Sequence, residues 1–266
     1  MAEDSGIRTD ALAARAWLEV GDLLDRQLSP LGERAIEALA PAPAERIVDI
    51  GCGAGQTVLQ LSERVGPEGQ VIGVDIARVL LDRARARAID VPQARFVGGD
   101  AALLDLPDES VDGVFSRFGV MRFADPVAAF ANFRRFLKRS GRLAFVCWRA
   151  LEDNELDSLP LRAAGLEDRA DKTPFSFENP KVIRDVLSAA GFQWIVVAPF
   201  DCAVSSGGLE EMLTVLFKVG PLGKIVRENL KLREAAEGRV RAALKAKIVD
   251  GRVSLNAAVW IVTAAA

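Results

Sequence analysis

The sequence contains no histidine and no tyrosine among its 266 residues. The missing imidazole excludes a Ser-His-Asp triad, a histidine general base and the His-Glu-x-x-His zinc motif. Any general base therefore has to be Asp, Glu, Lys or Cys, unless the substrate arrives already nucleophilic. The sequence assigns no particular catalytic residue.

The sequence also has few cysteines, no long apolar run and a small net charge. Cys52, Cys147 and Cys202 are few, odd in number and far apart, which predicts a reducing, cytoplasmic setting without a disulfide framework or a metal site. No apolar run approaches the ~20 residues that a membrane span needs, and the polar, acidic N-terminus is unlike a secretory signal. A net charge of −3 lacks the basic character of a nucleic-acid-binding protein.

Short apolar strands alternate with helical patterns through the first half of the chain. This alternation predicts a parallel sheet that helices cover on both faces. A helical pattern begins near residue 10, and Pro30 is expected to start a second helix that ends near residue 40. We expect strands at residues 47–50, 70–75, 94–97, 111–116 and 142–148, and helices at 56–65, 78–89 and 126–137.

The second half is less regular. It predicts a loop with short helical pieces at 151–178, a helix at 180–190, strands at 193–200 and 253–262, and helices over 207–248 that break at Gly220 and near Gly238. Trp194 and Trp260 lie in strand patterns and Phe130 and Phe133 on one helical stripe, so all four are expected in the core. The predicted organisation is an N-terminal helical lid at 1–45, a nucleotide-binding core at 46–200, a helical cap at 201–252 and the last core strand at 253–266.

A glycine-rich turn follows the first strand of the core. Asp49 ends that strand, and Gly51, Gly53 and Gly55 let the chain turn tightly and leave backbone open to a ligand. The turn lacks the third glycine of G-x-G-x-x-G, because Gln56 stands there, and Asp49 would repel a pyrophosphate. A carboxylate before the turn suits a ligand with a positive end and disfavours an NAD-type oxidoreductase.

Two further acids follow the next two strands. Asp75 lies 24 positions after Gly51, where an acid can accept both hydroxyls of a ribose. Asp100 and Ala101 follow the third strand, where an acid can accept the exocyclic amine of a purine. Since the carboxyl ends of parallel strands share one edge of a sheet, these sites describe an adenosine-type pocket.

These motifs resemble those of class I S-adenosylmethionine (SAM)-dependent methyltransferases. Residues 49–55 (DIGCGAG) resemble motif I, residues 73–76 (GVDI) the ribose-binding strand end, and residues 99–101 (GDA) the adenine-side motif. The FGVM at 118–121 and FVCWR at 145–149 resemble the small-molecule methyltransferases of ubiquinone and menaquinone biosynthesis. The resemblance implies an α/β, Rossmann-like fold with a seven-stranded, mostly parallel sheet in the order 3-2-1-4-5-7-6, an antiparallel last strand and a helical cap.

The resemblance also implies where the cofactor lies. Asp49 would lie near the amino end of the methionine moiety, and Asp75 would hold the ribose. The other implied contacts are the turn Gly51, Cys52, Gly53 and Gly55 along the methionine carboxylate, Ile76 on the adenine face, Asp100 and Ala101 at the adenine edge, and the backbone of Ser116 and Arg117 on the methionine side.

Candidates for the substrate wall come from strand ends and from the N-terminal helix. Arg122 is either a substrate-facing cation or a surface charge, and Trp148 is core, cofactor wall or substrate wall. The full candidate set is Trp17, Phe118, Met121, Arg122 and Trp148.

The function that this pattern favours is SAM-dependent methylation of a small molecule, with S-adenosylhomocysteine (SAH) as product. Two alternatives stay open at this point: a SAM-binding protein without methyl transfer, whether regulatory or with cyclase or lyase chemistry, and an NAD-type oxidoreductase. We expect a small-molecule partner, no nucleic acid, no membrane, and a monomer or homodimer whose helical cap is a lid or a dimer interface.

Overall fold

A computed structural model describes residues 2–266, and it gives the surroundings of side chains from residue 11 onward. The chain forms two compact units. The core unit comprises residues 31–148, 173–200 and 259–266, and the helical unit comprises the chain up to residue 30 with 149–172 and 201–258. The lid and cap assignments for residues 1–45 and 201–252 stay predictions.

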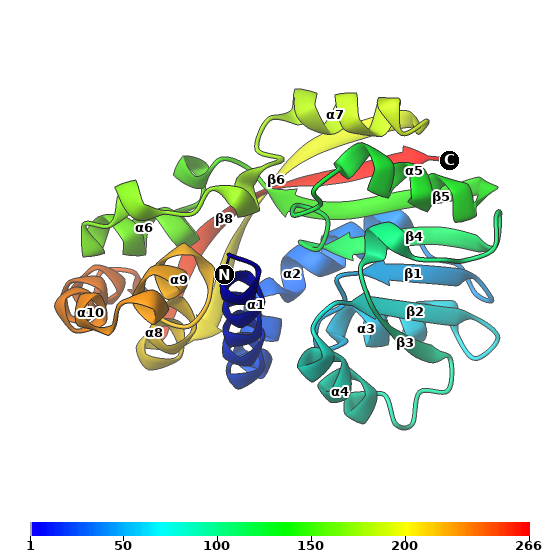
Figure 1. Ribbon diagram of the computed structural model, residues 1–266. Coiled ribbons are helices and arrows are strands. Elements are labelled where there is room, and N and C mark those ends of the chain that lie inside the picture. The colour runs from blue at the N-terminus through cyan, green and yellow to red at the C-terminus, as the bar shows by residue number, and fades with distance from the viewer. Residues whose placement is uncertain (1) are drawn as a thin grey trace. The chain divides into compact units, whose positions relative to one another are not determined.

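The core unit is built on a mostly parallel sheet. Its parallel strands are β1 (Arg46–Ile50), β2 (Gln70–Asp75), β3 (Ala94–Gly98), β4 (Val111–Arg117) and β5 (Leu137–Trp148), which lie side by side in the order β3-β2-β1-β4-β5 (Figure 1). The register pairs Ile50 with Val74 and Asp49 with Phe115, so neighbouring strands end at one edge. Strand β1 is buried over four of its five residues, as a central strand covered on both faces should be.

The sheet continues beyond β5 with two long strands. Strand β8 (Arg252–Ala265) pairs antiparallel to β5, and β6 (Gln193–Gly207) follows it, so the full order is β3-β2-β1-β4-β5-β8-β6. This confirms the predicted order and the antiparallel last strand. An additional two-residue strand, β7 (Ile248–Val249), forms a hairpin with the start of β8. Strands β6 and β8 each contribute residues to both units.

Helices of the core unit alternate with its strands along the chain, and side-chain caps mark the start of two of these helices. They are α3 (Gln56–Val65), α4 (Arg78–Arg87), α5 (Pro126–Phe136) and α7 (Pro180–Ala189), with 3-10 turns η1 (Ala101–Leu103) and η4 (Thr173–Phe175). The Asp125 carboxylate accepts the amide of Ala128 at 3.0 Å, and the Asn179 side chain accepts that of Lys181 at 2.9 Å. Each cap precedes a proline, whose fixed φ suits the first helical position.

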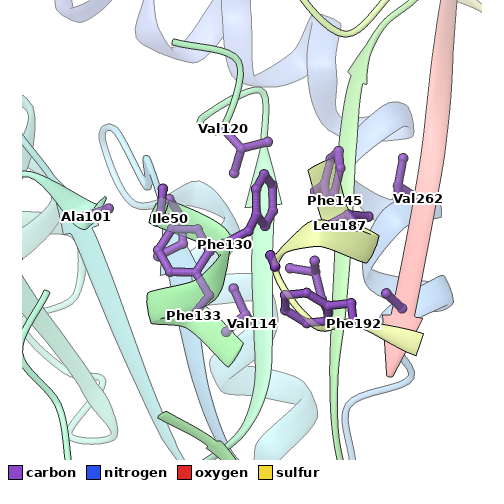
Figure 2. Packing of buried hydrophobic residues seen from close by; sticks show 14 of the residues in the cluster. Ile50, Ala101, Val114, Val120, Phe130, Phe133, Phe145, Leu187, Phe192 and Val262 are labelled. Atoms are coloured by element: carbon purple, nitrogen blue, oxygen red, sulfur yellow. The ribbon is translucent and has the colours of Figure 1, made fainter. Parts of the chain in front are cut away.

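A cluster of aromatic side chains lies between the sheet and helices α5 and α7 (Figure 2). Phe130 is fully buried and packs edge-on against Phe133, with ring centroids 5.5 Å apart, and against Phe192 at 6.4 Å. The prediction that Phe130 and Phe133 belong to the core is confirmed. Cys147 is also fully buried in this cluster, so its thiol serves packing.

Several helices of the helical unit pack around the last helix of the chain. Helix α10 (Leu230–Lys245) packs against α6 (Glu155–Ala164), α8 (Leu209–Leu216) and α9 (Gly220–Glu228), and its Val240 and Leu244 are fully buried. The unit also contains α1 (Ala2–Glu19), the first part of α2 (Gly21–Leu39), η2 (Leu151–Asp153) and η3 (Glu167–Arg169). None of the helices from residue 2 onward has the length and apolarity that crossing a bilayer requires.

Several element boundaries differ from the sequence-based expectation. Helix α2 runs through Pro30, which forgoes one intrahelical hydrogen bond because proline has no amide proton. The interruption comes at Val20 instead. Helix α10 likewise runs through Gly238, and the break lies at Asn229. Residues 155–164 form a full helix, α6, where only short pieces were expected.

The two strand tryptophans are less buried than expected. Trp194 is 84% exposed, so the prediction that it lies in the core is wrong. Its φ of +51° takes the residue out of the regular strand conformation, and with it out of the alternation on which the prediction depended. Trp260 is half-buried against the core cluster and donates its Nε1 proton to the carbonyl of Glu178 at 2.9 Å.

Candidate functional site

The glycine turn after β1 is held against two neighbouring strands. The amides of Gly51 and Cys52 both donate to the carbonyl of Val74, at 2.8 and 3.0 Å. A Cβ on Gly51 would lie 2.7 Å from the Cα of Gly119, just beyond β4, and φ at Gly51 is +71°. No side chain fits between these two backbones, so glycine is required at both positions.

Gly53 differs from Gly51 in what surrounds it. Its φ is +54°, and a Cβ built there meets no atom within 4 Å. Packing within the protein therefore does not require a glycine at this position. The turn leaves bare backbone facing open space, as a ligand that approaches the chain closely would require.

Asp75, at the end of β2, is tied to this turn. Its Oδ2 accepts the amide of Gly53 at 2.9 Å, and its Oδ1 accepts that of Ala77 at 2.8 Å. Burial raises the pKa of this carboxyl, while the backbone hydrogen bonds act in the opposite direction. Each carboxylate oxygen has a second lone pair, so the two oxygens can also accept the two hydroxyls of a ribose.

Asp49 is fully buried beneath the turn. Its Oδ2 accepts the hydroxyl of Thr57 at 2.5 Å, whereas its Oδ1 is buried with no hydrogen-bond partner in the structure. Burial raises the pKa of Asp49 to about 7, against the lowering effects of Thr57 and of the Arg117 charge. A buried acceptor without a donor is costly, so it marks a place for a donor from outside the chain.

The end of β4 brings the positive charge of Arg117 near Asp49. Arg117 donates from Nη1 to Oε1 of Gln56, the first residue of α3. Ser116, directly before it, is fully buried, and its hydroxyl donates to the carbonyl of Ile50 at 2.8 Å and accepts the amide of Gly119 at 3.0 Å. Ser116 thus fixes the end of β4 to the end of β1.

The expected adenine side presents exposed aliphatic side chains. Ile76 is 77% exposed, directly after Asp75. Asp100 is exposed and accepts the amide of Ala102 at 2.9 Å, while Ala101 is buried. Leu103, which no sequence motif indicated, is 80% exposed one turn further on. Apolar side chains left in water beside a binding edge are suited to cover a flat ring.

Two aromatic rings stack where β4 and β5 end. The rings of Phe118 and Trp148 lie 4.1 Å apart at an interplanar angle of 13°. Phe118 has a φ of +62°, a strained conformation for a residue with a side chain, and its amide donates to the carbonyl of Val146 at 3.0 Å. The structure thus brings together these two substrate-wall candidates, next to Gly119 and the glycine turn.

The other substrate candidates are placed differently. Met121 is buried in the core cluster, and its carbonyl accepts the Ser176 hydroxyl at 2.7 Å. Arg122 is exposed. Trp17 is 39% exposed on α1 and belongs to the helical unit. A role in substrate binding stays a prediction for all three.

No thiol at this edge is suited to act as a base. Burial raises the pKa of the Cys52 and Cys147 thiols, which keeps them protonated near neutral pH. Cys52 packs under the turn, where its Sγ would lie 2.9 Å from a Cβ on Gly73. From residue 2 onward, the structure contains no group of three or more His, Cys, Asp or Glu side chains placed to hold a metal ion.

The side chains and the open backbone at this edge of the sheet fit SAM. The unpartnered Oδ1 of Asp49 can accept an ammonium, the open backbone at Gly53 admits the methionyl chain, Asp75 can take the ribose, and exposed Ile76 can cover the adenine. Residues 48–145, which contain all these positions, match the family model described as a methyltransferase domain. This segment is a class I SAM-dependent methyltransferase domain. Members of this class take SAM as their methyl donor.

Named relatives extend the match across the methyltransferase domain. The chain is 34% identical over 119 residues to the aklanonic acid methyltransferase DauC of Streptomyces sp. strain C5, covering 44% of this chain and 54% of that protein. It is 38% identical over 132 residues to the demethylmenaquinone methyltransferase of Deinococcus radiodurans, covering 47% and 54%. The chain thus spans about half the length of these curated relatives.

A solved structure agrees with the fold over a larger share of the chain. The YcgJ protein of Bacillus subtilis superposes with a TM-score of 0.60 at 20% identity, covering 88% of this chain and 98% of that one. This similarity supports the Rossmann-like architecture around the methyltransferase domain.

Proposed function

We propose that the chain binds SAM at the carboxyl edge of β1, β2 and β4 and transfers its methyl group to a small-molecule acceptor. The single observation that carries this proposal is the buried Oδ1 of Asp49, which has no partner and lies beneath the open glycine turn. An ammonium group satisfies that oxygen, and the ribose contacts of Asp75 fix the other end of the ligand. The names of the relatives, each a methyltransferase for a named small molecule, support the choice of acceptor.

Methyl transfer from SAM requires little acid–base chemistry from the protein. SAM supplies a methyl group on a positively charged sulfur, and a lone pair of the acceptor forms the new bond while the methyl–sulfur bond breaks and its electrons stay on sulfur. The residues bind and orient SAM and the acceptor, and they exclude water. Well-oriented reactants alone can lower a barrier by roughly 7–11 kcal/mol. A chain without histidine can perform this reaction.

We further propose that Phe118 and Trp148 form a wall of the acceptor site and favour a flat, apolar acceptor. Their stacked rings lie where β4 and β5 end, on the same edge as the glycine turn. Strain at Phe118 fits a functional position, since φ of +62° costs free energy that packing elsewhere has to offset. The three free cysteines support the cytoplasm as the setting.

Calorimetric titration with SAM, SAH and NADH tests the cofactor assignment. We expect SAM and SAH to bind, NADH to give no signal, and binding to fall by at least about tenfold in Asp75→Asn, which loses the charge that accepts the ribose hydroxyls. Asp105→Asn, which changes an exposed loop carboxylate, serves as the matched control. Absence of SAH binding to the folded wild type would overturn the proposal.

Turnover tests the reaction itself. SAH release from SAM should appear with some members of a panel of flat aromatic phenols and quinols and not without acceptor. The variant Trp148→Ala should raise KM for such an acceptor while leaving SAH affinity unchanged. Tight SAM binding with no turnover on a broad acceptor panel would favour the SAM-binding alternative over methyl transfer.

A further inference from the structure

The chain leaves β4 in a strained conformation. Phe118 follows Arg117, the last residue of β4, and its φ of +62° lies in the left-handed region that a residue with a side chain disfavours. Its ring is half-buried against the core cluster and stacks on Trp148. A strained residue of this kind persists only where its surroundings fix the backbone.

Hydrogen bonds fix the backbone on both sides of Phe118. Its own amide donates to the carbonyl of Val146 on β5 at 3.0 Å. The next amide, that of Gly119, donates to the Ser116 hydroxyl at 3.0 Å, and this hydroxyl donates in turn to the carbonyl of Ile50 at 2.8 Å. Phe118 is therefore tied to β5 by its own amide and to the end of β1 through Ser116.

The Ser116 hydroxyl lies in a tightly packed place. Ser116 is fully buried, and its hydroxyl both donates and accepts a hydrogen bond. Gly119 is confined as well, because a Cβ there would lie 2.8 Å from Ser116 Oγ and 2.9 Å from Cα of Gly51. A buried amide that loses its acceptor is costly, so removal of the hydroxyl favours a movement of the peptide between Phe118 and Gly119 that gives the amide a new partner.

We propose that Ser116 is a positioning residue for the acceptor site, whose hydroxyl sets the direction of the Phe118 ring through the Gly119 amide. This inference rests on the proposed function, in which Phe118 and Trp148 form a wall for a flat acceptor. The family resemblance implied a cofactor contact for the backbone of Ser116. The side chain is assigned a different role, which concerns the acceptor.

The stacked rings make the acceptor site sensitive to the backbone at Phe118. Their planes lie 13° from parallel, and a relaxation of φ at Phe118 would break this arrangement. Because contacts between aromatic rings depend on their relative orientation, a flat acceptor would then bind more weakly. SAH should bind nearly as before, since the Ser116 hydroxyl bonds to neither Asp49 nor Asp75.

Binding of 1-naphthol to the SAH complex measures the wall without turnover. 1-Naphthol is a flat phenol, and SAH has no methyl group to transfer, so calorimetry gives an equilibrium affinity. Ser116→Ala should bind 1-naphthol about 3- to 10-fold more weakly than wild type, and SAH within about twofold of wild type. Ser116→Cys, which keeps a weaker donor and acceptor, should lie between.

Ser62→Ala is the matched control. It also truncates a fully buried serine of the core unit, but the Ser62 hydroxyl has no hydrogen-bond partner among the described residues. It should change neither the SAH nor the 1-naphthol affinity.

A double-mutant cycle shows whether Ser116 acts through Phe118. In a Phe118→Ala background there is no ring to direct, so Ser116→Ala should change the 1-naphthol affinity by less than about twofold. An effect of the same size with and without the ring overturns the proposal. Thermal unfolding of each variant shows whether it folds, and Ser116→Cys replaces Ser116→Ala in the cycle should the latter fail to fold.

The other outcomes separate this inference from the proposed function. Wild-type 1-naphthol affinity in folded Ser116→Ala, or an equal loss of SAH affinity, overturns the positioning role and leaves Ser116 a structural tie between β4 and β1. A wild-type protein that binds SAH but not 1-naphthol overturns the wall of Phe118 and Trp148, and this inference with it. A wild-type protein that does not bind SAH overturns the proposed function itself.

Discussion

The hydroxyl of Thr57 donates a 2.5 Å hydrogen bond to one carboxylate oxygen of Asp49, and both residues are fully buried. Thr57 lies in the first turn of α3, directly after the glycine turn, so the helix that follows the turn orients the acid that precedes it. The bond leaves the other oxygen, Oδ1, without a partner, and this is the oxygen that we propose accepts the ammonium of the ligand. Asp49 is thus held in one orientation before any ligand binds.

The affinity for SAH should depend on pH through Asp49. Its pKa is raised to about 7 in the ligand-free protein, so below pH 7 the ammonium of SAH meets a protonated, neutral carboxyl. Affinity should therefore rise with pH, by up to about tenfold per pH unit below 7, and level off above it. Calorimetry from pH 5.5 to 8.5 measures this dependence. A profile for Asp49→Asn that keeps the same slope would show that another group is responsible.

Replacing Thr57 should shift that profile. Thr57→Val keeps the shape and removes the hydroxyl that stabilises the ionised form of Asp49. The pKa of Asp49 should rise further, so the midpoint of the SAH binding profile should move to higher pH, and affinity at pH 7 should fall by about 3- to 10-fold. Thr57→Ser should restore the wild-type midpoint. An unchanged midpoint in Thr57→Val would contradict the role assigned to Thr57.

Two glycines at this edge should respond to substitution in different ways. In Gly119→Ala the new Cβ would lie 2.3 Å from the carbonyl oxygen of Ile50 and 2.9 Å from Cα of Gly51, so backbone has to move. We expect a loss of about 2–4 kcal/mol in the free energy of unfolding, measured by urea denaturation. SAH binding should be lost as well, because the glycine turn would be displaced.

Gly53→Ala should separate binding from stability. Its Cβ meets nothing within 4 Å, so only the positive φ is strained, at a cost of about 1–2 kcal/mol. The protein should fold, whereas SAH binding should fall by at least about tenfold because the methyl group occupies the ligand's space. Retention of wild-type SAH affinity in folded Gly53→Ala would show that the ligand does not approach this backbone.

The first strands of the core and the acids at the ends of β1 and β2 were accessible from sequence because each depends on a short local pattern. Asp49 and Asp75 follow apolar runs and border glycine or a helix start, and parallel pairing then brings them to one edge. The order of the strands in the sheet came from the family resemblance. Local patterns therefore predicted which residues end each strand and where the glycine turn lies.

Contacts between distant segments were not predictable in the same way. Gly119 meets Gly51 only because β4 pairs with β1 in a register that sets Phe115 beside Asp49, and no short motif encodes that register. The close approach of Arg117 to Gly32, where a Cβ would lie 3.0 Å from Cδ of Arg117, has the same origin, since it requires α2 and β4 to be packed together. Trp194 was misplaced because a positive φ at the second residue of β6 takes its side chain out of the strand alternation.

An ion pair at the opposite edge of the sheet should contribute to stability. Arg142 donates from Nη1 and Nη2 to the two carboxylate oxygens of Glu45 at 2.8 and 2.7 Å, and also to the carbonyls of Leu39 and Ala40. Arg142→Met breaks all four bonds and leaves the half-buried Glu45 without its cation, with only the amide of Ala42 as a hydrogen-bond partner. We expect a loss of about 1.5–3 kcal/mol in the free energy of unfolding at pH 7. Lys181→Met, which breaks an exposed pair with Asp185, should cost less than about 0.5 kcal/mol.

The loss in Arg142→Met should also depend on pH. The pairing with Arg142 holds the pKa of Glu45 below its ordinary value, against the effect of burial. A lowered pKa contributes stability that is present above the unfolded-state pKa near 4.5 and is lost as pH falls through the folded-state value. The difference between wild type and Arg142→Met should therefore shrink between pH 5 and pH 3 in urea titrations. A difference that stays constant over this range would mean that the bonds to the Leu39 and Ala40 carbonyls, rather than the charge of Glu45, carry the stabilisation.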